Sequence, residues 1–389
     1  MFITIIAFVG VLSLIVFFHE LGHFWTARKF GVKSEEFGLG FPPRAIGLYR
    51  DQEKKWKKVI GAKEVTDASD TIYSLNWIPL GGFVKIKGED GDQSGDPDSF
   101  GAQKIWKRAV ILLAGVTMNI ITAVILTSIG FAIGLPQVLG EENAHAIVTN
   151  QQVQIVDVMT DSPAAKAELK TGDVILSVNG QVIQKSEELQ NIVDATKDQL
   201  ATYQIKREGE TIFKEIVAEL RPETGRGGIG VGISNTGLVR YPFYLSFWYG
   251  LKEVFWLTVA IVMAFGQLLY GIFVGNGVSA EVAGPVGIAA MTGQVAHMGF
   301  VYLLQFTVML SVNLAIINAF PFPALDGGRL FFLLIEKIKG SPVKQEFEAV
   351  VHNLGFAFLM ILVVLVTFKD VSRYAGVFKA VWGKLIELI

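Results

Sequence analysis

Four runs of apolar residues are long enough to cross a lipid bilayer, and polar segments separate them. A helix of about 20 apolar residues matches the thickness of the hydrocarbon core, so each run predicts a transmembrane helix. The predicted spans are residues 1–24, 105–136, 301–340 and 350–369. We therefore expect a multi-pass α-helical membrane protein with about four transmembrane helices. Residues 370–389 are expected to form an amphipathic tail.

The lysines indicate which polar segments face the cytoplasm. Residues 25–104 are rich in lysine, for example at Lys54 and Lys55, and basic residues accumulate on the cytoplasmic side of membrane proteins. The outer segment, 145–222, then lies on the opposite side. A further segment, 243–300, contains an apolar run that also carries Lys252 and Glu253. If this run crossed the membrane, the next span would run outward and would place Asp326 on the opposite side of the membrane from His23. We therefore expect an interfacial or re-entrant element.

The outer segment has the pattern of a small α/β module. Asn179-Gly180 between two β-rich runs predicts a tight hairpin, and residues 186–195 have apolar positions at helical spacing. These features, with Ser162-Pro163-Ala164-Ala165 before them, resemble a PDZ domain of bacterial membrane proteases. Such domains bind an extended peptide as an added strand. We expect the module either to bind peptide termini or only to obstruct access to the membrane part.

Composition and charge restrict the function. The chain is 51% hydrophobic and 18% charged, which indicates a protein embedded in a lipid bilayer. A net charge of -2 provides no basic field for nucleic acid, so we expect no nucleic-acid partner. The sequence contains no cysteine. A metal site would therefore have to use His, Asp or Glu.

The end of the first apolar run carries a pattern typical of zinc peptidases. His19 and His23 are four residues apart, so on a helix they project from one face and can hold one zinc ion, while Glu20 can act as a general base. At about 1.5 Å per residue, Glu20 lies roughly 27 Å along the helix, within the bilayer. Ionisable residues there are costly and usually functional. The alternative is two buried histidines that only hydrogen-bond to neighbouring helices.

Asp326 is the best candidate for the third metal ligand. Pro321 and Pro323 should break the preceding helix, and Gly327 and Gly328 should let the backbone turn sharply and bring the carboxylate inward. The order of the spans places this segment on the same side of the membrane as His23. Without the histidine motif, we would interpret this segment as a proline-kinked helix end with Asp326 as its cap. We expect His145, His297 and His352 at surfaces or interfaces.

Several motifs together resemble the site-2 protease family of intramembrane metalloproteases, in its bacterial PDZ-containing branch. They are His19-Glu20-Leu21-Gly22-His23, Asn318-x-x-Pro321-x-Pro323-x-Leu325-Asp326-Gly327, Gly115-Val116-Thr117-Met118-Asn119, Ile78-Pro79-Leu80-Gly81-Gly82-Phe83-Val84-Lys85 and Gly284-Pro285-Val286-Gly287-Ile288. The resemblance implies a three-helix catalytic core in a multi-pass protein of the bacterial cytoplasmic membrane. It also implies a Zn²⁺-dependent endopeptidase that cuts transmembrane segments of single-span proteins, such as anti-sigma factors and remnant signal peptides.

The resemblance also implies substrate-binding residues. The region from Phe37 to Lys87 resembles membrane-dipping β-hairpins whose edge strand pairs with an extended substrate, which assigns that role to Gly82, Phe83, Val84 and Lys85. Asn119 and Asn318 are expected to hold the unwound substrate backbone or the oxyanion. The alternative functions are a transporter and a catalytically inactive membrane scaffold. Inverted repeats with charges at the membrane midplane would favour a transporter, and the sequence lacks them. An inactive scaffold would usually lose Glu20 or a metal ligand, and this sequence keeps all of them.

Overall fold

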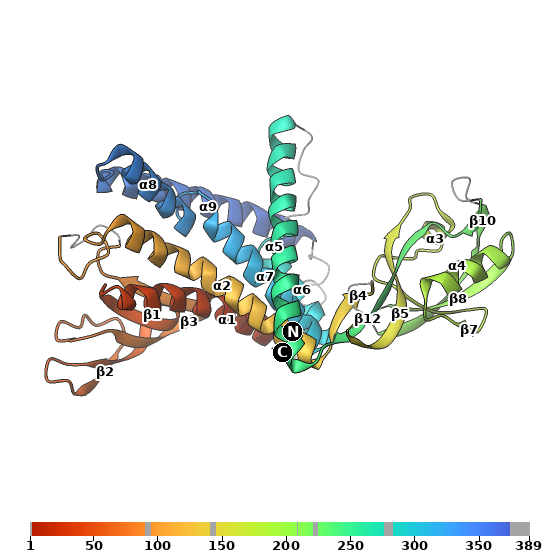
Figure 1. Ribbon diagram of the computed structural model, residues 1–389, viewed down its shortest axis with the longest axis horizontal. Helices are drawn as coiled ribbons and strands as arrows, with labels where there is room; N and C mark the ends of the chain where they lie inside the picture. The colour runs from red at the N-terminus through yellow and green to blue at the C-terminus, as the bar shows by residue number, and fades with distance from the viewer. Residues whose placement is uncertain are drawn as a thin grey trace, which may run out of the picture. The chain divides into compact units, whose positions relative to one another are not determined.

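The computed structural model describes residues 2–89, 95–140, 145–207, 209–220, 225–275 and 283–373 (Figure 1). These residues form two compact units. Unit 1 comprises residues 1–126, 251–297 and 306–389, and unit 2 comprises residues 127–250 and 298–305. Helices α2, α5, α6 and α7 each contribute residues to both units.

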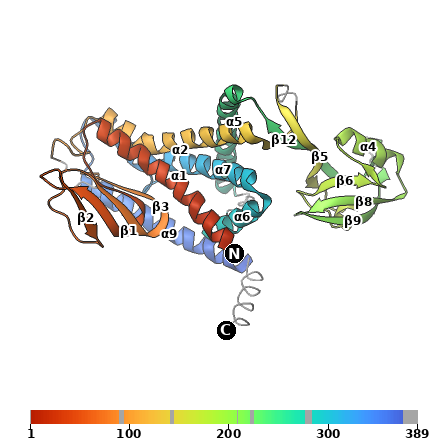
Figure 2. The same ribbon diagram turned by 90° about the horizontal axis from the view of Figure 1, so that it is seen from below.

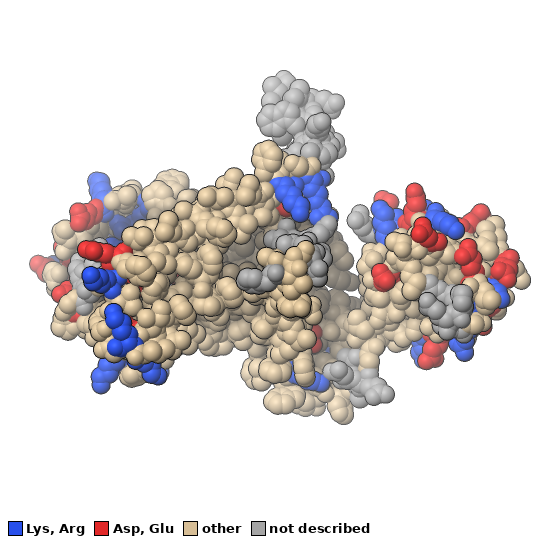
Figure 3. All heavy atoms as spheres, turned by 90° about the horizontal axis from the view of Figure 1, so that it is seen from above, with Lys and Arg blue, Asp and Glu red and all other residues tan. Residues whose placement is uncertain are grey.

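Unit 1 combines long apolar helices with one small sheet (Figures 1 and 2). The helices are α1 Phe2–Lys29, α2 Ile105–Ile133, α5 Phe243–Val274, α6 Pro285–Met298, α7 Phe300–Ala319, α8 Asp326–Lys339 and α9 Gln345–Arg373. Five of the described helices, α1, α2, α5, α7 and α9, are long and apolar enough to cross a membrane, one more than expected from the sequence. On the face shown in Figure 3, charged side chains gather at the left end of unit 1, and most of the helical surface is uncharged.

The predicted third span divides into two helices. Residues 301–340 form α7 and α8, which are separated by a short loop that contains Pro321 and Pro323. The break at the prolines therefore agrees with the prediction. Of the expected tail, residues 370–373 continue α9, and residues 374–389 lie outside the described part of the chain.

Helix α5 covers much of the segment 243–300, for which we expected an interfacial or re-entrant element. The stretch 247–273 belongs to a single unbroken helix. From Leu251 on, where α5 belongs to unit 1, the helix runs across α2 and α7 instead of alongside them (Figures 1 and 2). The ring of Phe265 on α5 contacts the ring of Phe320 at 5.2 Å between centroids.

The small sheet of unit 1 consists of β1 Ser34–Arg50, β2 Trp56–Ile60 and β3 Ile72–Ile86, in the order β2-β1-β3. Phe37 of β1 pairs with both Val84 and Tyr73, so the first part of β1 lies between the two halves of β3. Residues 82–86 of β3 therefore pair with β1 on one side, and no described strand pairs with their other edge. This end of the sheet packs against α1, where a Cβ atom on Gly82 would lie 2.9 Å from the Cα atom of Phe17.

Unit 2 contains a sheet with the strand order β4-β12-β5-β6-β8-β9, and β7 pairs with β6. Its elements are β4 Leu135–Val138, β5 Ile147–Val158, α3 Pro163–Lys166, β6 Val174–Val178, β7 Gln181–Val182, α4 Ser186–Ala195, β8 Leu200–Arg207, β9 Glu210–Val217, β10 Glu219–Leu220, β11 Gly227–Gly228 and β12 Val231–Arg240. The predicted helix over residues 186–195 is confirmed. The predicted hairpin is also confirmed, because β6 and β7 pair around Asn179 and Gly180, both at positive φ. The sheet continues past residue 222 through β12.

A buried ion pair supports unit 2. The Asp173 carboxylate, 1% exposed, accepts hydrogen bonds from Arg207 Nε and Nη2, both at 2.7 Å, and from the Lys170 amide at 2.8 Å. Burial opposes ionisation of Asp173, but these hydrogen bonds outweigh it and lower the pKa of this carboxyl. The ionised form of Asp173 is therefore stabilised in the folded domain.

Candidate metal centre

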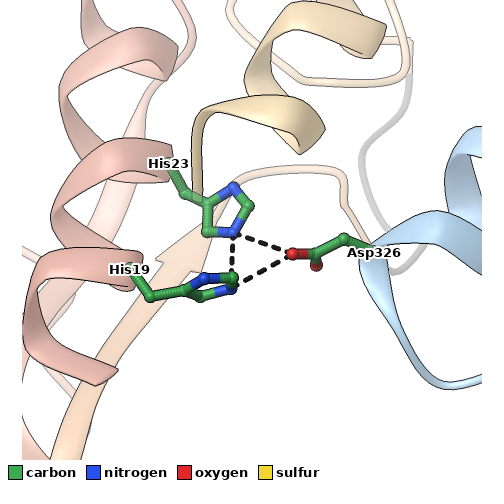
Figure 4. Close-up of side chains that lie close together, drawn as sticks. All are labelled: His19, His23 and Asp326. Carbon is green, nitrogen blue, oxygen red and sulfur yellow. Dashed lines mark hydrogen bonds and ion pairs between the residues drawn. The ribbon is translucent and has the colours of Figure 1, made fainter. Parts of the chain in front are cut away.

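Three potential metal-binding atoms converge inside unit 1 (Figure 4). The Oδ2 atom of Asp326 lies 3.1 Å from His19 Nε2 and 3.3 Å from His23 Nε2. The two Nε2 atoms are 3.2 Å apart. Both histidines are buried, and the Asp326 side chain is 23% exposed. Among the described residues this is the only group of three His, Asp or Glu side chains close enough to share one metal ion.

Helices α1 and α2 approach closely at the two histidines. His19 and His23 project from the same face of α1, as the spacing of four residues predicts. Gly22 of α1 faces the Ala114 carbonyl, which a Cβ atom would overlap, and a Cβ atom on Gly115 of α2 would overlap His23 Nε2. Both positions therefore require glycine. Gly115 belongs to a motif quoted above, but only the tertiary contact explains it.

The Nδ1 atom of each histidine faces a partner on α2. His23 Nδ1 lies 2.9 Å from the Ile111 carbonyl oxygen, and His19 Nδ1 lies 3.2 Å from the Asn119 side-chain amide. Because a carbonyl only accepts, a hydrogen bond here needs the His23 proton on Nδ1, which leaves Nε2, the atom that faces Asp326, as the nitrogen that can bind a metal. A backbone carbonyl has no sequence signature, so Ile111 could not be found from the sequence.

The loop between α7 and α8 brings Asp326 to the histidines. Helix α7 ends at Ala319, Ala324 has a φ of 75°, and Asp326 begins α8. The prediction that Gly327 and Gly328 form a sharp turn is wrong, because both lie in the first turn of α8. They are instead needed for close packing, since a Cβ atom on Gly327 would overlap the Phe320 carbonyl oxygen and one on Gly328 that of Phe322.

His352 supports the same loop. Its Nδ1 atom accepts a hydrogen bond from the Ala324 amide at 2.9 Å, and its side chain is 15% exposed. We expected His352 at a surface or interface, and its side chain is partly buried against this loop. The histidine holds Ala324, the residue at positive φ that precedes Asp326 by two positions.

Glu20 lies between the metal-binding atoms and strand β3. Its carboxylate interacts electrostatically with His23, with Asp326 and with the backbone amide of Val84. A Cβ atom on Gly82 would lie 3.3 Å from Glu20 Cγ, so the strand passes directly beside the glutamate. Of the four residues assigned to the substrate-pairing strand, Gly82 and Val84 are therefore next to Glu20, and Phe83 and Lys85 alternate with them along β3.

The two predicted asparagines differ in accessibility. Asn318 is partly exposed, and its Nδ2 atom lies 3.5 Å from His19 Nε2, on the metal-facing side of the ring. Asn119 is fully buried behind the ring, next to Nδ1. Asn318 therefore fits the predicted substrate role, and the position of Asn119 favours a different one.

The residues present fit a zinc ion. Four ligands at about 2.0–2.1 Å from tetrahedral zinc stand roughly 3.3 Å apart, close to the separations seen here. Asp326 Oδ2 is buried without a hydrogen-bond donor among the described residues, although both Nε2 atoms are at ion-pair distance. Lone pairs that face each other at this distance repel unless a cation lies between them. Two histidines and one carboxylate are also a known ligand set of catalytic zinc.

Comparisons with known proteins agree with this chemistry. The sequence profile of Peptidase family M50 matches residues 7–62 and 58–362. Zinc metalloprotease RasP of Geobacillus kaustophilus is 28% identical, with 95% of this chain and 98% of that protein covered. Regulator of sigma-W protease RasP of Bacillus subtilis is also 28% identical, with the same coverage. A solved PDZ domain of an SdrC-like protein from Listeria monocytogenes is 25% identical, covers 22% of this chain and 92% of that domain, and has a TM-score of 0.21.

Proposed function

The chain belongs to Peptidase family M50, and from this premise we propose that His19, His23 and Asp326 bind the catalytic zinc and that Glu20 is the general base. The family makes the protein a zinc-dependent intramembrane metalloendopeptidase of the site-2 protease type. The observation that carries the residue assignment is the convergence of three ligand atoms from α1 and α8. Neither alternative, an inactive scaffold or a transporter, is favoured.

Zinc, when bound, supplies a Lewis acid that polarises the scissile carbonyl and lowers the pKa of water toward about 7. The Glu20 carboxylate accepts the proton that the attacking water loses and passes it to the nitrogen of the leaving amine. Because the Glu20 carboxylate lies next to His23 and Asp326, it is close to the candidate zinc position, where both proton transfers would take place. The Asn318 side-chain amide can donate a hydrogen bond to the substrate backbone or to the developing oxyanion.

We assign substrate pairing to residues 82–85 of β3. A peptide bond in a helix is shielded by its own hydrogen bonds, so the substrate must unwind before it can be cut. An extended segment can add to the outer edge of β3, where no described strand pairs. Because Gly82 and Val84 are beside Glu20, a peptide bound there would have its backbone next to the general base.

The protein is a membrane protein, and we place the lysine-rich segment 25–104 in the cytoplasm and unit 2 on the outer side of the bacterial cytoplasmic membrane. Helix α5 would then lie along the membrane interface. Its course across α2 and α7, and its exposed aromatic side chains, support this placement. Those side chains are Phe243, Tyr244, Phe247, Trp248, Phe255, Trp256 and Tyr270.

The expected substrates are single-span membrane proteins. One relative is named a regulator of sigma-W protease, which supports anti-sigma factors as a substrate class for this chain. Remnant signal peptides are the second class. The PDZ-like module of unit 2 either binds peptide termini of such substrates or obstructs the access of larger proteins.

Two substitutions test the residue assignment. Glu20→Gln should retain stoichiometric zinc, because the ligands remain, and should lower cleavage of a model transmembrane substrate below about 1% of wild type. Asp326→Ala should lose zinc as well as activity. Zinc content and cleavage are measured on the same purified samples. Substantial cleavage by Glu20→Gln would exclude Glu20 as the base, and full zinc content in Asp326→Ala would exclude Asp326 as a ligand.

A further inference from the structure

Asn119 lies behind the candidate metal centre instead of in front of it. Its side chain is 0% exposed and faces His19 Nδ1 at 3.2 Å, on the side of the ring away from Asp326. A substrate backbone approaching Glu20 and β3 cannot contact a group that is fully enclosed by protein. The role predicted from the sequence, a direct contact with the substrate, therefore does not match this position.

The position of Asn119 fits a residue that selects the tautomer of His19. A neutral imidazole carries its proton on one nitrogen and a lone pair on the other, and only the lone pair can bind a metal. If His19 binds zinc through Nε2, as the proposed function requires, its proton must be on Nδ1. An acceptor next to Nδ1 stabilises that tautomer and orients the ring. For His23 the Ile111 carbonyl is this acceptor.

The side-chain amide of Asn119 can provide the matching acceptor for His19. Its Nδ2 atom faces the ring, and within the described chain its buried Oδ1 atom has no hydrogen-bond partner. A half-turn of the amide exchanges the two atoms without moving the rest of the side chain. The exchange places Oδ1 next to the proton on Nδ1, so that the contact with His19 joins a donor and an acceptor instead of two donors. It is therefore favoured whenever Nε2 of His19 is engaged as a ligand.

Asn119 is held firmly enough for this role. Ser311 of α7, itself 0% exposed, donates a hydrogen bond from its hydroxyl to the backbone carbonyl of Asn119 at 2.8 Å. Ile111, Gly115 and Asn119 follow one another at intervals of one helical turn on α2. One face of α2 thus provides a partner for each Nδ1 atom and, at the glycine between them, room for both rings.

We propose that Asn119 is a positioning residue that holds His19 in the tautomer with Nδ1 protonated and thereby raises zinc affinity. The proposal rests on the proposed function only in taking His19 as a ligand. It predicts an effect on metal binding in the absence of any substrate. A direct substrate contact predicts no such effect.

The experiment measures the zinc dissociation constant of full-length variants in detergent by competition with a chelator. Asn119→Leu, which keeps the size but removes the acceptor, should weaken zinc binding about 10–100-fold. Asn119→Asp, which only accepts, should stay within about threefold of wild type. Asn313→Leu is the matched control, because Asn313 on α7 hydrogen-bonds to the Met309 carbonyl of its own helix, and it should bind zinc normally.

The visible absorption of the Co²⁺-substituted protein provides a second readout. The spectrum should change in Asn119→Leu and remain unchanged in Asn119→Asp, because the ring orientation sets the ligand field. Unchanged zinc affinity in Asn119→Leu, with a higher KM for the substrate, would overturn the proposal in favour of substrate binding. Equal loss of zinc in Asn119→Leu and Asn119→Asp would also overturn it. If Asn119→Leu does not fold, Asn119→Asp still tests the proposal, because a loss of zinc in this variant would contradict it. Failure of the proposed function would appear separately, as normal zinc affinity in His19→Ala.

Discussion

Substitution of Gly115 by alanine tests whether the close approach of α2 shapes the metal centre. The added Cβ atom would lie 2.7 Å from His19 Cε1 and 2.8 Å from His19 Nε2, and it would overlap His23 Nε2. Ordinary contact begins at 3.4 Å, so His19 would have to retreat by about 0.7 Å, and His23 further. Metal sites tolerate ligand displacements of roughly 0.2 Å. The imidazoles therefore cannot keep their positions around a zinc ion.

The expected result is a loss of zinc affinity and of activity of about 100-fold or more, since a displacement near 1 Å at an active site has an effect of this size. Alanine is a better helix former than glycine by roughly 0.5–1 kcal/mol, so α2 itself should not be weakened. Gly10→Ala on α1 is the control, because nothing lies within 4 Å of its Cβ position. Zinc is measured by chelator competition, and cleavage with a model transmembrane substrate. Zinc binding and cleavage at wild-type levels in Gly115→Ala would refute this geometry.

Three further predictions follow from the topology, the strand edge and unit 2. Single cysteines at the exposed positions Lys55 and Gln184 should be labelled from opposite sides of the membrane by an impermeant reagent, and labelling from the same side would contradict the topology. Val84→Pro, which removes a backbone donor next to Glu20, should lower cleavage about 100-fold with normal zinc content, whereas Val84→Ala should lower it less than threefold. Because the folded pKa of Asp173 is lowered, its stabilisation is present above about pH 4 and is lost as the pH falls through the folded value. At neutral pH Asp173→Asn should therefore destabilise unit 2 by about 3 kcal/mol, measured by hydrogen exchange of residues 145–240 in the full chain.

The sequence determined the features that depend on neighbouring residues. Helical spacing aligned His19 with His23, the prolines ended α7, and the Asn-Gly pair formed its hairpin. Each of these follows from backbone geometry over a few residues. The cost of polar groups in hydrocarbon also pointed to the end of the first helix and, with the order of the spans, to Asp326. Local physics therefore predicted the three side chains that converge in the candidate metal centre.

Only the tertiary structure decided what surrounds this group. The glycines after Asp326 were read as a turn, but they allow α8 to pack on carbonyl oxygens of the preceding loop. The direction of α5 depends on its contacts with other helices, which an apolar run cannot encode. The Ile111 carbonyl and the place of Asn119 behind His19 depend on how closely α1 and α2 pack. That distance is set by small residues on two helices far apart in the sequence, so it exists only after both have been brought together.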